Sequence, residues 1–221
     1  MRRELPIFPL PDLVFFPETT LPLQIFEPRY RAMLEDAMEG DRTIGIQTLS
    51  APGAVTDVIG DPAVLAVGCA GEIVEHEPQD DGRSHIVLTG LYRYRIVSEV
   101  ASGRPYRIAR VDEYPIAPLS PSRSSPQSKT FRTLLTEVVN RLATSVGRVE
   151  AGELPLELSD EGLVNEAVSR LGLDTDDRYR LLTMERLEER YRWVLEHVAG
   201  VQRRLDLLAP FRRARTEARW N

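Results

Sequence analysis

Two arginines alternate with two tyrosines in one short run of the chain, Tyr92-Arg93-Tyr94-Arg95. Basic residues interleaved with aromatic ones suit single-stranded nucleic acid, because the rings stack on bases and the guanidinium groups contact phosphates. In an extended strand, however, alternate residues point to opposite faces. We therefore expect the tyrosines to face the core and Arg93 and Arg95 to face solvent, and we keep RNA binding as the alternative.

Three histidines and one cysteine are the other residues suited to metal binding or nucleophilic catalysis. His76 and His85 flank Asp81-Gly82, a pair that favours a two-residue hairpin turn. In that register the two imidazoles are at best diagonal to one another, so we expect solvated hairpin residues and no metal site. Cys69 lies in an apolar stretch, where a free cysteine usually packs as a small hydrophobe. We expect no cofactor.

The charge of the chain is unevenly distributed. Residues 1–118 contain 11 arginines and 18 acidic residues, a net charge of −7, whereas residues 119–221 contain 17 basic and 16 acidic residues. The first half is therefore a poor electrostatic partner for a polyanion. This makes nucleic acid an unlikely ligand on charge grounds.

Cysteine content and hydropathy bear on the compartment. One cysteine in 221 residues excludes an intrachain disulfide, as expected in a reducing cytosol. No apolar run approaches the roughly 18–20 residues that a membrane span requires. We expect a cytoplasmic protein without a membrane partner.

The opening of the chain combines apolar residues with many prolines, in LPIFPL (5–10), VFFP (14–17) and LPLQIFEPRYR (21–31). Proline removes an N–H group and fixes φ, so this segment favours extended edge strands and tight connections. Pro28 differs, because it occupies a first helical position and is followed by apolar residues at helical spacing. We predict a helix over residues 28–39.

This opening resembles the start of the amino-terminal, substrate-binding domain of Lon proteases. The resemblance continues through GI (45–46), VGCAGEI (67–73) and LTGLYRYRI (88–96). It covers about the first half of the chain well and the second half only in general character. It implies a stand-alone recognition module without the ATPase and peptidase parts of the full protease. That fold is also similar to RNA-binding modules of the PUA type.

The sequence contains neither set of residues on which a Lon protease depends for catalysis. The phosphate-binding pattern G-x-x-x-x-G-K-[ST] is missing from the sequence. A serine–lysine dyad would have to use Lys129, the only lysine, whose neighbour Ser128 does not face it on a helix. We therefore expect no enzymatic activity and assign no catalytic residue.

The periodicity of apolar residues changes from two to 3.6 after a stretch rich in proline and serine. We predict an α+β protein with a β-rich domain over residues 1–116 and a linker over 117–127. A helical bundle over residues 128–210 and a basic tail over 211–221 follow. The β-rich domain is expected to be a PUA-like bent barrel of about six strands with one helix. Ser159 and Asp174 are predicted helix N-caps.

The predicted function is non-catalytic recognition of protein segments or of one specific protein partner, with a role as an adaptor in protein quality control. A module of this kind must expose apolar surface, and Phe15 and Phe16 lie in a proline-bounded connection where aromatic residues need not all be buried. A sheet edge kept open by prolines is a second means of holding an extended chain. One alternative is that these phenylalanines fill the core together with Phe8 and Phe26. The other is that Arg93 and Arg95 bind RNA as part of a basic patch with Arg107 and Arg110. The sequence leaves the oligomeric state open.

Overall fold

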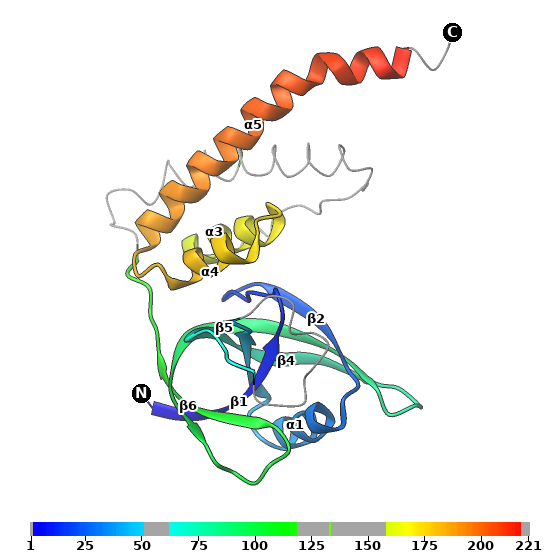
Figure 1. Ribbon diagram of the computed structural model, residues 1–221, viewed down its shortest axis with the longest axis vertical. Helices are drawn as coiled ribbons and strands as arrows, with labels where there is room; N and C mark the ends of the chain where they lie inside the picture. The colour runs from blue at the N-terminus through cyan, green and yellow to red at the C-terminus, as the bar shows by residue number, and fades with distance from the viewer. Residues whose placement is uncertain (1, 51–61, 119–132, 134–157, 218–221) are drawn as a thin grey trace. The chain divides into compact units, whose positions relative to one another are not determined.

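The computed structural model describes residues 2–50, 62–118, 133 and 158–217 (Figure 1). Contacts divide the chain into two compact units. The first, which we call the barrel unit, consists of Met1–Ala117 and Leu173–Glu185. The second, the helical unit, consists of Pro118–Gly172 and Arg186–Asn221. Each unit is described by itself below.

Six strands form the sheet of the barrel unit, in the order β2-β5-β4-β3-β1-β6. They are β1 (Arg2–Leu10), β2 (Thr20–Ile25), β3 (Thr43–Thr48), β4 (Val67–Pro78), β5 (Ser84–Val100) and β6 (Arg107–Glu113). An additional pairing between β5 and β6 closes five of the strands into a ring, with β2 attached to the outside of β5. Six strands agree with the sequence prediction, and the PUA-like assignment stays a prediction.

The ring closes at one end only, because two strands change partners. β5 pairs with β2 over Ser84–Thr89 and with β6 over Tyr94–Val100. β1 pairs with β6 up to Ile7 and with β3, in parallel, from Ile7 onward. The proline-rich β1 therefore has a partner strand on each side, but along different parts of its length, so each part has one open edge in the described sheet.

The inside of the ring is filled by one large aromatic side chain, Tyr94, which is fully buried. Its hydroxyl donates to the carbonyl of Ile46 at 3.3 Å. Gly45 and Gly68 provide the space, because a Cβ atom at Gly45 would lie 2.5 Å from the Tyr94 hydroxyl and one at Gly68 2.7 Å from its ring. Side chains from β1, β4 and β6 complete this small core.

The single helix that follows β2, α1 (Pro28–Glu39), closes a second core against the sheet. Its bounds match the predicted helix, with Pro28 in its first turn and the chain leaving the helix at Gly40. Tyr30, Met33 and Leu34 are buried on its inner face, where Cys69 is also buried, as predicted. The first residues of this helix lie beside the ends of β1 and β2.

The hairpin between β4 and β5 projects from the barrel (Figure 1), and its loop is longer than the predicted two-residue turn. Pro78 pairs with Ser84 and His76 with Ile86, whereas a two-residue turn at Asp81-Gly82 would pair His76 with Val87. The Gly82 N–H donates to the Gln79 carbonyl, and Gly82 has a φ of +80°. The loop is therefore a type I turn followed by a left-handed glycine, and the predicted two-residue turn is wrong by one residue of register.

A short helix from the later part of the chain, α4 (Thr175–Thr183), belongs to the barrel unit and not to the predicted bundle. Arg93 on β5 holds it: Nη1 donates to the carbonyls of Leu182 and, at 2.8 Å, Met184. The Tyr114 hydroxyl donates to the Thr183 carbonyl at 3.0 Å. Several carbonyls at the carboxyl end of α4, which have no partner within the helix, are satisfied in this way.

The helical unit contains α3 (Asp160–Arg170) and α5 (Leu187–Glu217) in its described part. The two helices share a buried polar contact, in which Arg190 donates to the Asn165 side chain at 2.6 Å. Ser159 accepts from the Gly162 N–H at 3.0 Å, and Asp174 caps α4 in the same way, so both predicted N-caps are confirmed. Among the helices of the described ranges, none is long and apolar enough to cross a membrane.

Several predictions fall on other parts of the chain. Most of the predicted linker and the first part of the predicted helical bundle, including Lys129, lie outside the described residues, apart from residues 117, 118 and 133. The helical bundle therefore stays a prediction. Helix α5 continues to Glu217, into the predicted basic tail.

We expect the Arg93→Lys variant to lose about 2 kcal/mol of unfolding free energy, because one ammonium group cannot reproduce the planar, two-carbonyl contact of a guanidinium. Arg95→Lys is the matched control, because Arg95 is exposed on the same strand. We expect the unfolding free energy of this variant to differ from that of the wild type by less than about 0.5 kcal/mol. Urea denaturation measures both. Equal unfolding free energies for the two variants would show that the contact with α4 does not stabilise the barrel unit.

Candidate functional site

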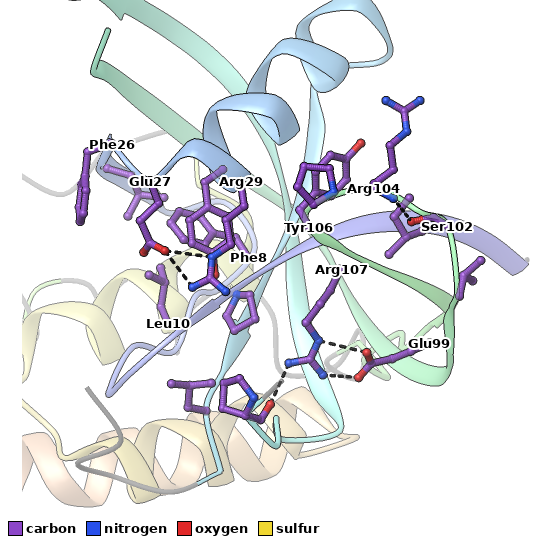
Figure 2. A pocket seen from close by; sticks show the side chains of 18 of the residues that line it. Phe8, Leu10, Phe26, Glu27, Arg29, Glu99, Ser102, Arg104, Tyr106 and Arg107 are labelled. Atoms are coloured by element: carbon purple, nitrogen blue, oxygen red, sulfur yellow. Dashed lines mark hydrogen bonds and ion pairs between the residues drawn. The ribbon is translucent and has the colours of Figure 1, made fainter. Parts of the chain in front are cut away.

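A hollow of about 840 Å³ lies in the barrel unit beside the ends of β1 and β2 (Figure 2). One wall is formed by residues 8–11 at the end of β1, and another by residues 23, 24, 26 and 27 at the junction of β2 and α1. The end of the β5–β6 hairpin, residues 99–108, forms a third wall, and Leu49 and Pro62 lie at its edge. The hollow is thus built from segments that are far apart in the sequence.

Apolar and aromatic side chains dominate the interior of the hollow. Phe8 and Tyr30 lie against each other with ring centroids 4.2 Å apart. Leu10, Leu23 and Ile108 pack beside them at the border of the core. Such a surface is suited to an apolar side chain of a ligand, because burying it removes apolar area of both partners from water.

The charged groups around the hollow are paired with each other, with one ion pair on either side (Figure 2). Arg29 Nε and Nη2 both lie 2.9 Å from Glu27 Oε2. Arg107 forms an ion pair with Glu99, and its Nη1 also donates to the Pro62 carbonyl at 2.8 Å. Because these charges neutralise one another, the rim does not demand a charged ligand.

Tyr106 and Asp36 form a hydrogen bond of 2.5 Å behind the third wall, and Arg104 forms an ion pair with the same carboxylate. Burial and this hydrogen bond raise the pKa of Tyr106 to about 12. The hydrogen bond from Tyr106, followed by Arg104, lowers the pKa of Asp36. The contact fixes the 101–106 loop to α1, and so holds one wall of the hollow in place.

Phe26 is the exposed aromatic residue at the rim, with 60% of its surface accessible. Three other exposed hydrophobic residues, Val74, Leu91 and Val97, are each the extra residue of a β-bulge, which explains their exposure. Phe26 is in no strand pairing. It precedes the N-cap Glu27, where a hydrophobic residue normally packs against the fourth helical residue.

That position is occupied by Arg31, so Phe26 has no apolar partner for this contact. The sequence therefore contained a signal that Phe26 is exposed, although it was considered together with the core phenylalanines. At the start of the helix, Glu27 and Arg29 form an ion pair, and Glu27 makes no side-chain capping bond.

The two phenylalanines named as binding candidates lie in the interior. Phe15 is 4% and Phe16 1% exposed. Phe15 belongs to the core beneath α1, where a Cβ atom on Gly71 would meet its ring at 2.8 Å. The Phe16 carbonyl passes so close to β5 that a Cβ atom on Gly90 would lie 2.1 Å from it. The structure thus places both side chains where the core interpretation expected them.

The arginines named as the RNA-binding alternative do not form a common patch. Arg93 is only 3% exposed, so the expectation that it faces solvent is wrong, because α4 covers that face of β5. Arg95 is exposed and lies 4.4 Å from the centre of the Tyr114 ring. Arg107 is paired with Glu99 and Arg110 with Glu4.

The histidines of the hairpin are not brought together as metal ligands. His76 Nε2 lies 3.2 Å from the Ser84 hydroxyl, and His85 is exposed. Within the described residues, no three or more His, Cys, Asp or Glu side chains are grouped so as to hold a metal ion.

Replacing Tyr106 with Phe tests the wall contact through its pH dependence. Because the pKa of Tyr106 is higher in the folded than in the unfolded chain, its stabilising contribution is complete below pH 10. It is lost as the pH rises from 10 to about 12. We expect Tyr106→Phe to be less stable than the wild type at pH 8, and the difference to shrink toward pH 11. Urea denaturation at several pH values measures it; a constant difference would contradict the assignment.

Comparison with known proteins identifies a family. A family model described as the ATP-dependent protease La (LON) substrate-binding domain matches residues 4–200. The Lon protease of Flavobacterium johnsoniae is 25% identical over 214 residues, which are 92% of this chain and 25% of that protein. Lon protease 2 of Myxococcus xanthus is 34% identical over 108 residues, 49% of this chain and 13% of that protein. The chain thus spans at most about a quarter of the length of these curated relatives.

Two solved structures share the fold. The Lon N-terminal domain protein from Xanthomonas campestris has a TM-score of 0.59 at 21% identity, covering 88% of this chain and 98% of that chain. The N-terminal domain of Mycobacterium avium complex Lon protease has a TM-score of 0.63 at 16% identity, covering 89% and 98%. The family match extends over most of the barrel unit and into α5. This chain belongs to the family of the Lon protease substrate-binding domain.

Proposed function

We propose that this protein binds exposed apolar segments of other proteins, without catalysis of its own, at the hollow beside β1 and β2. The family to which the chain belongs is described by substrate binding, which supports a recognition role. We further propose that recognition serves protein quality control, with this chain delivering or holding damaged proteins.

The observation that carries the proposal is the position of Phe26 at the rim of an apolar hollow. A side chain that is 60% exposed loses apolar area from water when a ligand covers it. The hollow behind it is lined by Phe8, Leu10 and Leu23, so an apolar side chain of the ligand gains contacts on several sides. The paired rim charges accept such a ligand without leaving a charge buried and unpaired.

RNA binding receives less support from the same structure. It calls for a patch of accessible arginines around Arg93, Arg95, Arg107 and Arg110. Arg93 is buried against α4, and the last two are in ion pairs with carboxylates. Breaking those pairs would cost part of the energy that phosphate contacts provide, and the −7 charge of residues 1–118 opposes the approach of a polyanion.

Replacing Phe26 with Ser tests the proposal. We expect the variant to bind a permanently unfolded, carboxymethylated protein about 5- to 20-fold more weakly, because the contact of one aromatic ring contributes on the order of 1–2 kcal/mol. Leu91→Ser is the matched control, since Leu91 is 42% exposed on β5 and does not line the hollow. Binding is measured by fluorescence anisotropy, after circular dichroism has shown that both variants are folded.

Equal loss of binding in the two variants would show that surface hydrophobicity in general, and not the hollow, holds the ligand. Unchanged binding by Phe26→Ser, together with binding that falls steeply with salt and prefers single-stranded RNA, would replace the proposal with the RNA alternative.

A further inference from the structure

The sheet of the barrel unit is incomplete beside the hollow. Beyond Ile7, β1 has β3 on one side and no described strand on the other, since β6 pairs with it only up to that residue. β2 has β5 on one side and no described strand on the other. The hollow is lined by the ends of both strands. Two strand edges without a partner in the described sheet therefore border the same space.

The hydrogen-bond pattern decides which main-chain groups of β2 point away from β5. The Gly90 N–H donates to the Thr19 carbonyl at 2.9 Å and the Gly90 carbonyl accepts from the Glu18 N–H at 2.8 Å, so Thr19 stands opposite Gly90 at a hydrogen-bonding position of the ladder. In an antiparallel ladder every second residue of a strand bonds to the neighbouring strand, so the main-chain groups of Leu21, Leu23 and Ile25 bond to β5. The N–H and carbonyl groups of Thr20 and Gln24, and the carbonyl of Pro22, point to the outer edge.

The same reasoning applies to the end of β1. The Leu49 N–H donates to the Leu10 carbonyl at 3.1 Å, so Leu10 and Phe8 bond to β3 in this parallel pair. Pro9 therefore has its carbonyl on the open side. Pro9 and Pro22 thus stand on the open edges, where a missing N–H leaves no ladder bond unmade within the protein.

We propose that the bound segment is held as an added strand on the outer edge of β2. This inference rests on the proposed function and specifies how the ligand is bound. The segment pairs with the main-chain groups of Thr20, Pro22 and Gln24, and Gln24 also lines the hollow. Main-chain bonds are independent of sequence, so they suit a module that accepts many ligands, while alternate apolar side chains of the segment enter the hollow beside Leu23 and Phe26.

The charge of residues 1–118, which contain all six strands, specifies the ligand further. Eighteen acidic residues stand against 11 arginines in residues 1–118. Six of these arginines, among them Arg29, Arg83 and Arg104, already pair with carboxylates. The ligand that complements this surface is an extended, alternately apolar segment with basic residues at its ends.

Proline on the edge limits the strength of this pairing. At Pro22 the added strand finds an acceptor but no donor, so one bond of the ladder is missing. Natural sheets use proline on exposed edges to prevent uncontrolled pairing between copies. The edge of β2 therefore binds an added strand only weakly, which allows the ligand to be released.

Peptides methylated on alternate main-chain nitrogens test the proposal. The probe is a fluorescein-labelled peptide with Val and Leu at alternate positions, Thr between them and Arg at both ends. One methylated form carries methyl groups on the main-chain nitrogens of the odd-numbered peptide residues, and the other on those of the even-numbered residues. Only one parity places N–H groups toward β2, so we expect one form to bind at least about tenfold more weakly and the other to bind like the unmodified peptide. Anisotropy with the full-length protein measures all three.

Each other outcome overturns the proposal in a recognisable way. Equal binding of both methylated forms would exclude edge pairing and leave the proposed function standing, provided that Phe26→Ser still weakens binding. If neither the peptides nor the unfolded protein bound, both the edge pairing and the proposed function would be excluded. The protein alone could also sediment as a dimer, and the Gln24→Pro variant as a monomer. That result would show that a second copy of the chain occupies the edge. A peptide with Asp at its ends that binds as tightly as the Arg form would exclude the basic ligand.

A variant of the protein gives an independent measurement. Pro22→Ala restores the missing donor at an exposed position, and we expect it to bind the unmodified peptide about three- to tenfold more tightly. The gain should disappear with the peptide form that is methylated toward β2. A variant with unchanged affinity for the unmodified peptide would count against pairing at Pro22.

Discussion

The seventeen-residue strand β5 is the constraint on which the barrel unit depends. On one side its first part pairs with β2 and its last part with β6, while β4 pairs with it on the other side from Ser84 to Arg95. One continuous strand therefore belongs both to a closed ring and to an open extension. Closure satisfies the main-chain groups at one end, and the other end is left with the free edges that border the hollow. The glycines at 45 and 68 make closure possible by leaving room for Tyr94.

Proline has a consistent position in this architecture. Pro9 and Pro22 stand where a main-chain nitrogen would face the open side, so the sheet loses no internal hydrogen bond. The residues that make the opening of the chain unsuited to helix also protect the incomplete sheet from uncontrolled pairing. The same segment thus defines the strands, the hollow and the limits on what the edge accepts.

Contacts between distant parts of the sequence account for the buried charges. Arg93 bonds to carbonyls about 90 positions later, and Arg190 bonds to Asn165 within the helical unit. A buried guanidinium group is tolerated because its donors meet oxygen atoms that would otherwise lack partners. In both places a buried arginine is a structural connection, although the strand pattern assigned Arg93 to solvent, so arginine count alone overstates the basic surface.

The sequence by itself determined the local structure: the helix from Pro28 to Glu39, the caps at Ser159 and Asp174, and most strands, because proline geometry, capping and periodicity act between near neighbours. It also separated Tyr94 from Arg93 on opposite faces of β5. Only the tertiary structure decided what covers each face. Arg93 is buried because α4 returns to the barrel, and the hollow exists because β1, β2 and the β5–β6 hairpin end together. Such packing depends on contacts between residues far apart in the chain, which periodicity along one segment does not encode.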